Sequence, residues 1–370
     1  MIDELAKVAA LFGLAERSIA LIDRCRPLNA TSEARRTRES WARQQPTNPA
    51  WIYAAPPDLG PLSAELARVA ARLDRNDDVE ALYAARADEL ELEARSAEAI
   101  GGSRFMALAR QRYPVPPASE AREQARAWAS SGVEPMTTRP ETIPSDARTD
   151  PRSLLSQMLA EVALRQLPVS VVLRENLQSV AATTSESVLI KPGVRLSARE
   201  ARRIVVHELV GHVVPRVSAR SAPLGLLRVG SAGAADDEEG RALALERRAG
   251  LLGRERQVEL GRRHLAALCT AEGADWVETV RTLVQGGSPP DCAMEIANRV
   301  QRGGGLAREL VYLPALARVE RAIEREPELD AWLAAGRLSL HAARVLERAR
   351  PELVERALGS SHARGWGSRR

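Results

Sequence analysis

The stretch IVVHELVGHVV, residues 204–214, places two histidines and one glutamate inside a run of aliphatic residues. Just before it, Ser197 and Glu200 have the spacing of a capping box, in which both side chains satisfy free amides at a helix start. The stretch is therefore predicted to lie on a helix that begins at Ser197 and ends near Pro215. Because ionisable side chains are costly to bury without partners, this helix needs a compensating group beside its histidines.

A zinc ion is a partner that suits these side chains. His207 and His212 would bind it through imidazole nitrogens, and Glu208 would accept a proton from the water that zinc activates. Histidines four residues apart lie about 40° apart around a helix, whereas the five-residue step found here gives about 140°. Convergence on one ion requires a local widening or an early end of the helix, and Gly211 is where this costs least. The competing interpretation is a helix with two hydrogen-bonded structural histidines.

A third ligand is expected on a later helix, as in zincin-type sites. The acidic run at 236–239 opens the next predicted helix after a glycine-rich loop. Acidic residues in a first helical turn also complement the helix dipole without any metal. Glu239 shares a helix face with the apolar residues Ala242 and Leu243, whereas Glu238 does not. Glu239 is therefore the carboxylate that we expect to point inward.

The pair of motifs HELVGH (207–212) and EEGRA (238–242) resembles the microtubule-associated tyrosine carboxypeptidase family and its bacterial relatives. Those relatives are described as tyrosine/phenylalanine carboxypeptidase-domain or QEGLA-motif proteins. The family pattern is HExxxH, then a Gln-Glu-Gly-Leu-Ala segment whose glutamate is the third zinc ligand. The resemblance implies zinc as the cofactor, a zincin-like core, and the following roles: zinc ligands His207, His212 and Glu239, and general base Glu208.

The resemblance covers roughly residues 20 to 350. Segment 299–303 followed by Tyr312 is similar to the family's Arg-Gly segment and Tyr-Leu motif, and segments 26–29 and 102–105 also have family counterparts. Three residues depart from the family pattern in ways expected to alter the specificity pocket: Glu238 in place of Gln, Arg241 in place of Leu, and Gln301 where many relatives have an aromatic residue.

A carboxypeptidase has to bind the terminal carboxylate of its substrate, usually with arginine or lysine. Lys191 stands out in a chain whose basic residues are almost all arginine, and it follows a predicted strand shortly before the zinc helix. Arg299 and Arg302 are candidates to clamp the carboxylate, and the Tyr312 hydroxyl is a candidate to support the oxyanion. Ordinary surface charge and core packing are the competing explanations for these four residues.

Composition and periodicity predict an α+β fold that is mostly α-helical. Hydrophobic residues make up 45% of the chain and aromatic residues only 3%, so alanine, leucine and valine must build the core, and long stretches are helix-periodic. Residues 2 to about 25 are predicted to form one helix, and the polar residues from there to Trp51 a loop. The short stretches VSVVL (169–173) and SVLI (187–190) are rich in β-branched residues and are predicted to be strands.

The expected architecture is a zincin-like metallopeptidase core with a small β-sheet, flanked by helical N- and C-terminal regions. A segment rich in proline and threonine is the best candidate for a boundary. The predicted divisions are an N-terminal helical region at 1–130, a linker at 131–151, a catalytic core at 152–260, a C-terminal helical region at 261–357 that completes the cleft, and a basic disordered tail at 358–370.

Charge, hydropathy and cysteine content indicate which compartment and which partners to expect. The net charge of +4 is small for 370 residues, and the basic residues alternate with acidic ones, a pattern typical of solvated helix faces and not of a nucleic-acid groove. No run approaches the roughly 18 apolar residues of a membrane span. Three widely separated cysteines suit a reducing compartment. We therefore expect a cytoplasmic protein that spans no membrane and binds no nucleic acid.

These features together predict a zinc-dependent metallocarboxypeptidase that removes the C-terminal residue of a peptide or protein substrate. An aromatic terminal residue is implied by the resemblance alone. The alternatives are a metallo-endopeptidase or aminopeptidase of zincin type, and a catalytically inactive zinc-binding interaction module. An open cleft on both sides of the metal would favour an endopeptidase, and a blind basic pocket beyond the scissile bond would favour a carboxypeptidase.

Overall fold

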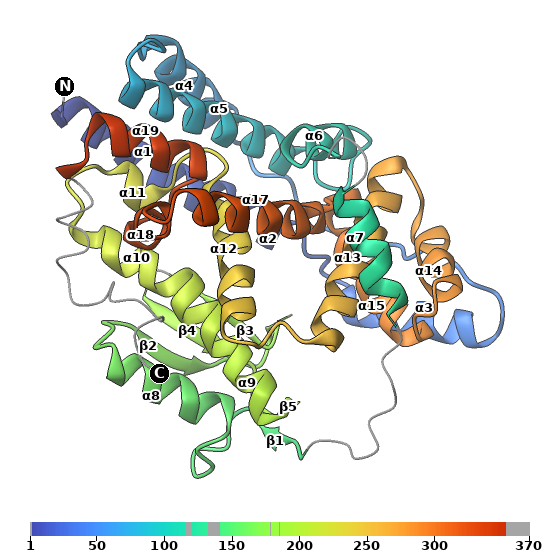
Figure 1. Ribbon diagram of the computed structural model, residues 1–370. Coiled ribbons are helices and arrows are strands. Elements are labelled where there is room, and N and C mark those ends of the chain that lie inside the picture. The colour runs from blue at the N-terminus through green and yellow to red at the C-terminus, as the bar shows by residue number, and fades with distance from the viewer. Residues whose placement is uncertain (1, 116–119, 132–140, 178, 185, 353–370) are drawn as a thin grey trace.

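Helices form most of the structure, and a small sheet lies on one side of them (Figure 1). The computed structural model describes residues 2–115, 120–131, 141–177, 179–184 and 186–352. The helices that precede the sheet are α1 (Ile2–Ile19), α2 (Leu21–Arg24), α3 (Ala30–Ala42), α4 (Gly60–Arg72), α5 (Asp78–Glu98), α6 (Phe105–Arg112), α7 (Glu120–Ser130) and α8 (Leu154–Leu164). The strands are β1 (Ile143–Pro144), β2 (Ser170–Leu173), β3 (Ala181–Thr183), β4 (Ser187–Ile190) and β5 (Arg195–Leu196).

The remaining chain is helical and begins with a continuous helical segment of three parts. These parts are α9 (Ala198–Val205), the π-helix η1 (Val206–Val213) and α10 (Val214–Ser218). The helices that follow are η2 (Ala219–Ser221), α11 (Leu226–Val229), α12 (Ala234–Arg248), α13 (Arg254–Glu272), α14 (Trp276–Gln285), α15 (Pro290–Val300), α16 (Arg302–Gly305), η3 (Arg308–Val311), α17 (Tyr312–Arg325), α18 (Leu329–Ala335) and α19 (Leu340–Ala349).

The first 51 residues differ from the prediction in two respects. Ala20 adopts a φ of 39°, so the predicted single helix is divided into α1 and α2. The predicted polar loop contains the helix α3, whose buried side chains are Glu33, Thr37 and Ser40. Glu33 accepts a hydrogen bond from the backbone amide of Ala50 at 2.6 Å. Polar contacts therefore hold α3 in place, and hydrophobic periodicity could not reveal it.

Three strands form the main sheet in the order β2-β4-β3. β2 runs parallel to β4 and β3 runs antiparallel to it, while β1 and β5 form a separate two-stranded ladder. β2 and β4 confirm the two predicted strands. β3 was missed, because its sequence Ala-Ala-Thr has little strand propensity and its conformation depends on pairing with β4.

The helix that begins at the Ser197 capping box confirms the predicted start but does not end at Pro215. It continues through η1 into α10. In the π-helical register the Val210 carbonyl would accept a hydrogen bond from residue 215, and proline has no amide hydrogen. Arg241 of α12 supplies the missing donor, because its Nη1 lies 3.2 Å from the Val210 oxygen. A side chain from another helix thus allows the proline to remain inside this one.

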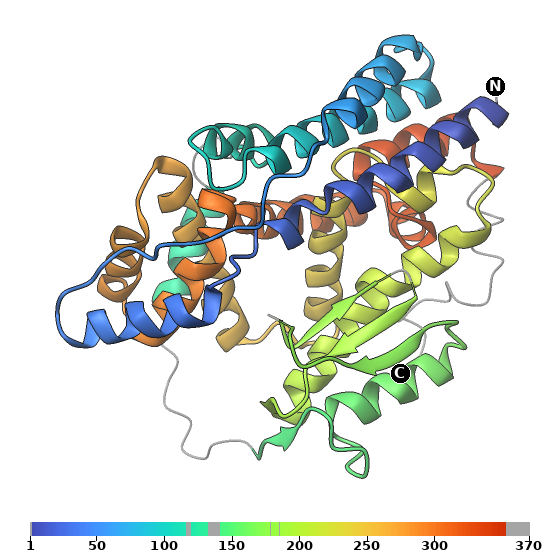
Figure 2. The same ribbon diagram turned by 180° about the vertical axis from the view of Figure 1, so that it is seen from behind.

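Helices from both ends of the chain share one hydrophobic core. Phe12 of α1, Leu66 of α4 and Tyr83 of α5 belong to the same buried cluster as Trp332 of α18 and Leu346 of α19. Figures 1 and 2 show α1, α5 and α19 side by side along one edge of the molecule. The predicted N-terminal and C-terminal helical regions therefore pack against each other.

A second core lies between the sheet and the helices α8, α9 and η1. Its buried members include Met158, Val188, Ile190, Val205 and Leu209. In Figure 2 the sheet lies in front of the helical segment α9–η1, with β3 next to η1. The helix α12 stands between this part and the helical layer, because it contacts both η1 and α17 (Figure 1).

The fold class is confirmed as α+β and mostly helical, whereas the zincin-like nature of the core stays a prediction. Residues 132–140 of the predicted linker and the whole predicted tail at 358–370 lie outside the described residues. Among the helices of the described ranges, none is long and apolar enough to cross a bilayer.

Candidate metal centre

His207 and His212 both lie on the π-helix η1. A π-helix closes its hydrogen bonds between residues i and i+5, so residues five apart lie about one turn from each other. The two imidazole rings are therefore neighbours in an edge-to-face arrangement, with their centroids 5.0 Å apart. The local widening that the five-residue spacing predicts is confirmed. Both histidines are almost completely buried, at 9% and 7% exposure.

Two close backbone approaches fix α12 next to these histidines. A Cβ at Gly211 of η1 would lie 2.7 Å from the Cβ of Ala242 of α12. A Cβ at Gly240 of α12 would lie 2.5 Å from the backbone of Ala315 of α17. α12 is therefore held between η1 and α17 at distances that leave room only for glycine. Gly211 was expected to ease the distortion of the helix. The close approach of Ala242 explains why this position is a glycine.

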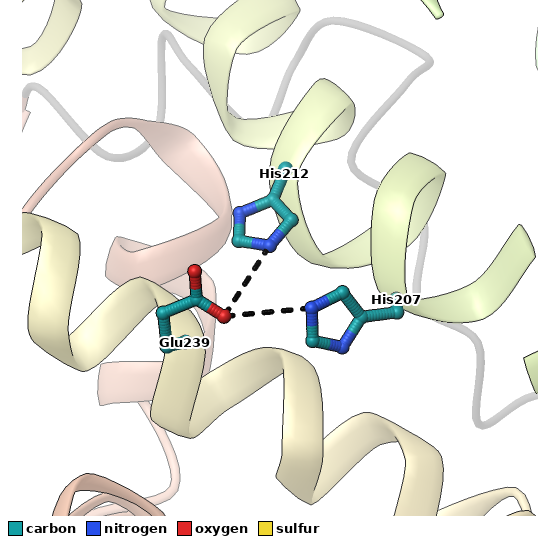
Figure 3. A group of neighbouring side chains, drawn as sticks. All are labelled: His207, His212 and Glu239. Atoms are coloured by element: carbon teal, nitrogen blue, oxygen red, sulfur yellow. Dashed lines mark ion pairs between the residues drawn. The ribbon is translucent and has the colours of Figure 1, made fainter. Parts of the chain in front are cut away.

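Glu239 of α12 completes a triangle of ligand atoms with the two histidines (Figure 3). Its Oε2 atom lies 3.4 Å from Nε2 of His207 and 3.8 Å from Nε2 of His212. Zinc–ligand bonds of 2.0 to 2.2 Å in a tetrahedron place neighbouring ligand atoms about 3.4 Å apart. Glu239 Oε2 is buried, and within the described residues it has no hydrogen-bond partner. The three residues therefore fit a zinc ion.

Each of the three residues is held from behind by a charged partner. Glu246 Oε1 lies 2.7 Å from Nδ1 of His207, and Glu238 Oε1 lies 3.1 Å from Nδ1 of His212. The hydrogen bond from Glu246 fixes the tautomer and orientation of the His207 imidazole, whereas Glu238 and His212 are within ion-pair distance without hydrogen-bond geometry. The other oxygen of Glu239, Oε1, accepts a hydrogen bond of 2.8 Å from Arg308. Glu238 is buried like Glu239, although the helix faces predicted only Glu239 to point inward.

The carboxylates of the site remain ionised despite their burial. Burial raises the pKa of Glu239, but Arg308, His207 and His212 together hold it well below its ordinary value. Burial also raises the pKa of Glu238, and the positive charge of Arg216 and of His212 brings it down to about 2. The histidines thus lie among ionised carboxylates, and imidazole nitrogens and carboxylate oxygens are both donors that zinc binds in proteins.

Two cavities meet at this cluster. The smaller has a volume of about 580 Å³, and we call it the arginine cavity because these arginines line it: Arg26, Arg203, Arg216, Arg256, Arg263, Arg299, Arg302 and Arg308. The larger has a volume of about 1000 Å³ and is also lined by eight arginines, most of which come from other segments, such as Arg17, Arg112 and Arg337. His212 and Glu239 line both cavities, whereas His207 and Glu208 line only the arginine cavity. A bound metal would therefore stand between the two spaces.

Glu208 is half-buried and lies next to His207 on η1. Its carboxylate lines the arginine cavity, and no side chain of the described residues forms an ion pair or hydrogen bond with it. A carboxylate in this position is available to a molecule bound in the cavity. The predicted general base is thus on the side of the histidine pair that faces the smaller cavity, with Arg299 and Arg302.

The structure brings three of the four predicted substrate-binding residues to the arginine cavity. Arg299, Arg302 and Tyr312 line it together with the histidines. Lys191 lies at the end of the central strand β4 and lines neither cavity. Its backbone carbonyl accepts a hydrogen bond from Ser145, at the ladder of β1 and β5.

Segments far apart in the sequence hold the backbone that follows Arg299 and Arg302, where α15 ends and α16 begins. Gly303 follows Arg302 with a φ of 71°, its amide donates to the Cys25 carbonyl at 3.1 Å, and its carbonyl accepts from the Gly101 amide at 2.9 Å. The segments 26–29, 102–105 and 299–303, which resemble family segments, therefore lie next to one another in the structure. Gln301 does not line the arginine cavity, because its amide donates to the Ala274 carbonyl at 2.9 Å.

Sequence reasoning missed several residues of the site, and one of them had a detectable signal. Glu246 lies seven residues after Glu239 and hence on the same face of α12. Arg308 lies in a stretch without a motif, yet it contacts both Glu239 and the Tyr312 hydroxyl. Arg263 reaches the cavity from α13, and no sequence pattern distinguishes it from its neighbour Arg262.

Comparison with known proteins identifies the family. The sequence profile described as microtubule-associated tyrosine carboxypeptidase matches residues 39–357, a range that includes the histidine pair, Glu239 and most of the arginine cavity. No curated protein and no solved structure matches the chain significantly. The resemblance found in the motifs is confirmed, and the chain belongs to the microtubule-associated tyrosine carboxypeptidase family.

Proposed function

We propose that this protein is a zinc-dependent metallocarboxypeptidase that releases one residue from the C-terminus of a peptide or protein. The observation that carries the proposal is the triangle of His207, His212 and Glu239 beside a cavity lined by arginines. Membership of a family named for a carboxypeptidase supports the same activity. Zinc, when bound, would supply the Lewis acidity that activates a water and polarises the scissile carbonyl.

Arginines favour a carboxypeptidase over the two related peptidases. A free C-terminus carries a carboxylate, which arginine binds with paired charge-assisted hydrogen bonds. An aminopeptidase has to bind a protonated amine, and eight arginines around the cavity would repel it. An endopeptidase binds neither the C-terminal carboxylate nor the N-terminal amine, so it needs no charged pocket for either. The larger cavity on the other side of the metal site is the space proposed for the rest of the substrate chain.

The roles proposed for this chain's own residues follow from their positions. Glu208 takes a proton from the attacking water and delivers it to the nitrogen of the leaving amino acid. Arg299 and Arg302 bind the terminal carboxylate and place the last peptide bond beside the metal site. The hydroxyl of Tyr312 stabilises negative charge on the carbonyl oxygen. Glu246 holds the imidazole of His207 in one orientation.

Peptides with chemically modified ends test this function. Zinc-loaded protein is incubated with a peptide that has a free C-terminus, with the same peptide as its C-terminal amide, and with its N-acetylated form, and the products are read by mass spectrometry. The proposal expects loss of one C-terminal residue from the free and the N-acetylated peptides and no cleavage of the amide. Glu208→Gln is expected to retain zinc and to lose at least about 100-fold in rate.

Other product patterns would assign another function. Cleavage of the amidated peptide at an internal bond would indicate an endopeptidase, and protection by N-acetylation would indicate an aminopeptidase. Zinc bound by His207, His212 and Glu239 without any cleavage would indicate a zinc-binding interaction module. A Glu208→Gln variant with full activity would refute the proposed base.

A further inference from the structure

Arg308 lies at the boundary between the two cavities and lines both of them. Its side chain is 14% exposed, so it is turned mostly away from bulk water. Nη2 of Arg308 donates a hydrogen bond of 2.8 Å to Oε1 of Glu239, and Nη1 donates one of 3.3 Å to the Tyr312 hydroxyl. One guanidinium group therefore connects a residue of the candidate metal centre with the residue proposed to stabilise the oxyanion.

The backbone immediately before Arg308 is held in a conformation that is rare for residues with a side chain. Ala307 has a φ of 50°, in the left-handed region. Its side chain is 3% exposed and packs in the core that α13, α14 and α15 share, and its amide donates to the Val300 carbonyl at 3.0 Å. Such conformations persist only where the surrounding structure determines them, and they concentrate at functional sites. The core behind Ala307 therefore fixes the direction in which the chain presents Arg308.

The contact with Glu239 separates the two oxygens of that carboxylate. Oε1 accepts from Arg308, whereas Oε2 is buried, has no hydrogen-bond partner within the described residues and lies 3.4 Å from Nε2 of His207. Among the described residues, Glu239 is the only carboxylate that forms an ion pair with Arg308. If Oε1 turned towards a metal, a buried guanidinium group would lose its counter-charge, and that loss is costly. Arg308 therefore leaves one oxygen of Glu239 for the metal.

Binding through one oxygen matters because of the number of ligands. Zinc in catalytic sites has three protein ligands and keeps a fourth tetrahedral position for water or substrate. His207, His212 and one oxygen of Glu239 supply three ligand atoms. A second oxygen from Glu239 would take the remaining position. The contact with Arg308 thus distinguishes a site that can act on a substrate from a site that the protein fills itself.

The contact with Tyr312 directs the phenol hydrogen. A hydroxyl that accepts a hydrogen bond from an arginine has its own hydrogen free for another acceptor. Tyr312 lines the arginine cavity, as His207 and Glu208 do, so a molecule bound there can supply that acceptor. Donation to the hydroxyl oxygen also polarises the O–H bond and strengthens the hydrogen bond that the hydroxyl donates. Arg308 therefore prepares Tyr312 to donate to a carbonyl oxygen.

We propose that Arg308 is a positioning residue: it restricts Glu239 to binding the metal through one oxygen, and it orients the Tyr312 hydroxyl towards the carbonyl of the substrate. The second role rests on the proposed carboxypeptidase function. The first role concerns the geometry of the metal centre alone and is measured without any substrate.

The competing explanation is an ion pair that only holds two parts of the chain together. Arg318 of α17 offers a matched control, because it pairs with Asp237 of α12, two residues before Glu239, with its Nε 2.9 Å from Oδ1. Arg318 lines neither cavity. Arg318→Met therefore removes an ion pair between α12 and the segment that follows α16, and leaves the site itself unaltered.

Crystal structures of the zinc-loaded protein and of its variants test the first role. Methionine at position 308 keeps the length of the side chain and removes its charge and its donors. The proposal expects Glu239 to bind zinc through one oxygen in the unaltered protein and in Arg318→Met, and through both oxygens, each within about 2.5 Å of the ion, in Arg308→Met. Arg308→Lys keeps the charge and is expected to restore binding through one oxygen. Binding through both oxygens in the unaltered protein, or through one in a folded Arg308→Met, would overturn this role.

Steady-state kinetics of peptide hydrolysis test the second role. Arg308→Lys offers one nitrogen where arginine offers two, so it serves Glu239 and releases Tyr312. Arg308→Lys, Tyr312→Phe and the double variant are therefore expected to lose kcat equally, each about 10- to 100-fold, with KM changed less than about twofold. Arg318→Met is expected to keep the kcat of the unaltered protein. Effects that multiply in the double variant would show that Arg308 does not act through Tyr312 and would overturn this role.

The two tests separate this proposal from the proposed function. If the zinc-loaded protein cleaves no peptide, the carboxypeptidase function fails, and the role of Arg308 towards Tyr312 fails with it. The crystal structures would still decide whether Arg308 restricts Glu239 to one oxygen.

Discussion

Gly211→Ala changes the distance between the two helices that carry the zinc ligands. The added Cβ would lie 2.7 Å from the Cβ of Ala242 and 3.2 Å from its Cα. Carbon atoms in contact prefer separations of about 3.5 to 4.0 Å, so η1 and α12 have to move apart by about 1 Å. Zinc sites tolerate deviations of only about 0.2 Å in their ligand distances. The shift carries Glu239 away from both histidines.

The expected result is a zinc affinity reduced by about 10- to 100-fold, together with a loss of about 1 to 3 kcal/mol in the free energy of unfolding. Zinc affinity is measured by competition with a chromophoric chelator, and stability by urea denaturation of the metal-free protein. Gly60→Ala is the control for the substitution itself, because its Cβ would meet only Asp58 Oδ1 at 3.6 Å. It is expected to leave zinc affinity unchanged.

A double variant tests the cause directly. Ala242→Gly removes the atom nearest to the added Cβ, so Gly211→Ala combined with Ala242→Gly is expected to recover most of the lost zinc affinity. The two substitutions should therefore be strongly non-additive. Unchanged zinc affinity in Gly211→Ala, or no recovery in the double variant, would refute the close approach as the origin of the ligand triangle.

Three further outcomes follow from the same contacts. Glu246→Gln is expected to weaken zinc binding about 10- to 100-fold in the same chelator competition, since it removes the charge behind an imidazole; equal affinity would show that this carboxylate does not support the ligand. Arg241→Leu, which restores the family residue, is expected to lower the free energy of unfolding by about 1 to 3 kcal/mol, because the Val210 carbonyl and Asp330 both lose a partner. Arg248→Leu removes the exposed second partner of Asp330 and should cost less than about 1 kcal/mol in the same urea titration, so equal losses would contradict the role of Arg241 in the π-helix. Zinc at 100 times its dissociation constant is expected to raise the free energy of unfolding by about 2.7 kcal/mol, and a melting temperature that does not respond to zinc would contradict a site formed by the folded state.

Local signals in the sequence predicted the parts of the site that depend on local structure. The capping box at Ser197 fixes the helix start through two hydrogen bonds within four residues. The step between His207 and His212 predicted either a local widening or an early end of the helix, and the structure shows the widening. Glu239 was predicted as the third ligand because it shares a helix face with apolar residues and matches the glutamate of the family pattern.

The features that were missed depend on contacts between distant segments. The continuation of the helix past Pro215 needs Arg241 from another helix, and no rule for proline alone predicts it. β3 forms by pairing with β4, although Ala181 and Ala182 have little strand propensity. Lys191 was singled out by its rarity and by its place after a strand that would line the cleft, but that strand, β4, is the central one of the sheet and Lys191 lines neither cavity. The arginine cavity is lined by segments that lie far apart in the sequence and whose order gives no sign of their meeting.

The most direct test of the metal centre is the position of the ion in a crystal of the zinc-loaded protein, located by anomalous diffraction at the zinc absorption edge. We expect one ion at full occupancy, about 2.0 to 2.2 Å from Nε2 of His207, Nε2 of His212 and Oε2 of Glu239. Absence of zinc from this triangle, or an ion coordinated by other residues, would contradict the proposed metal centre.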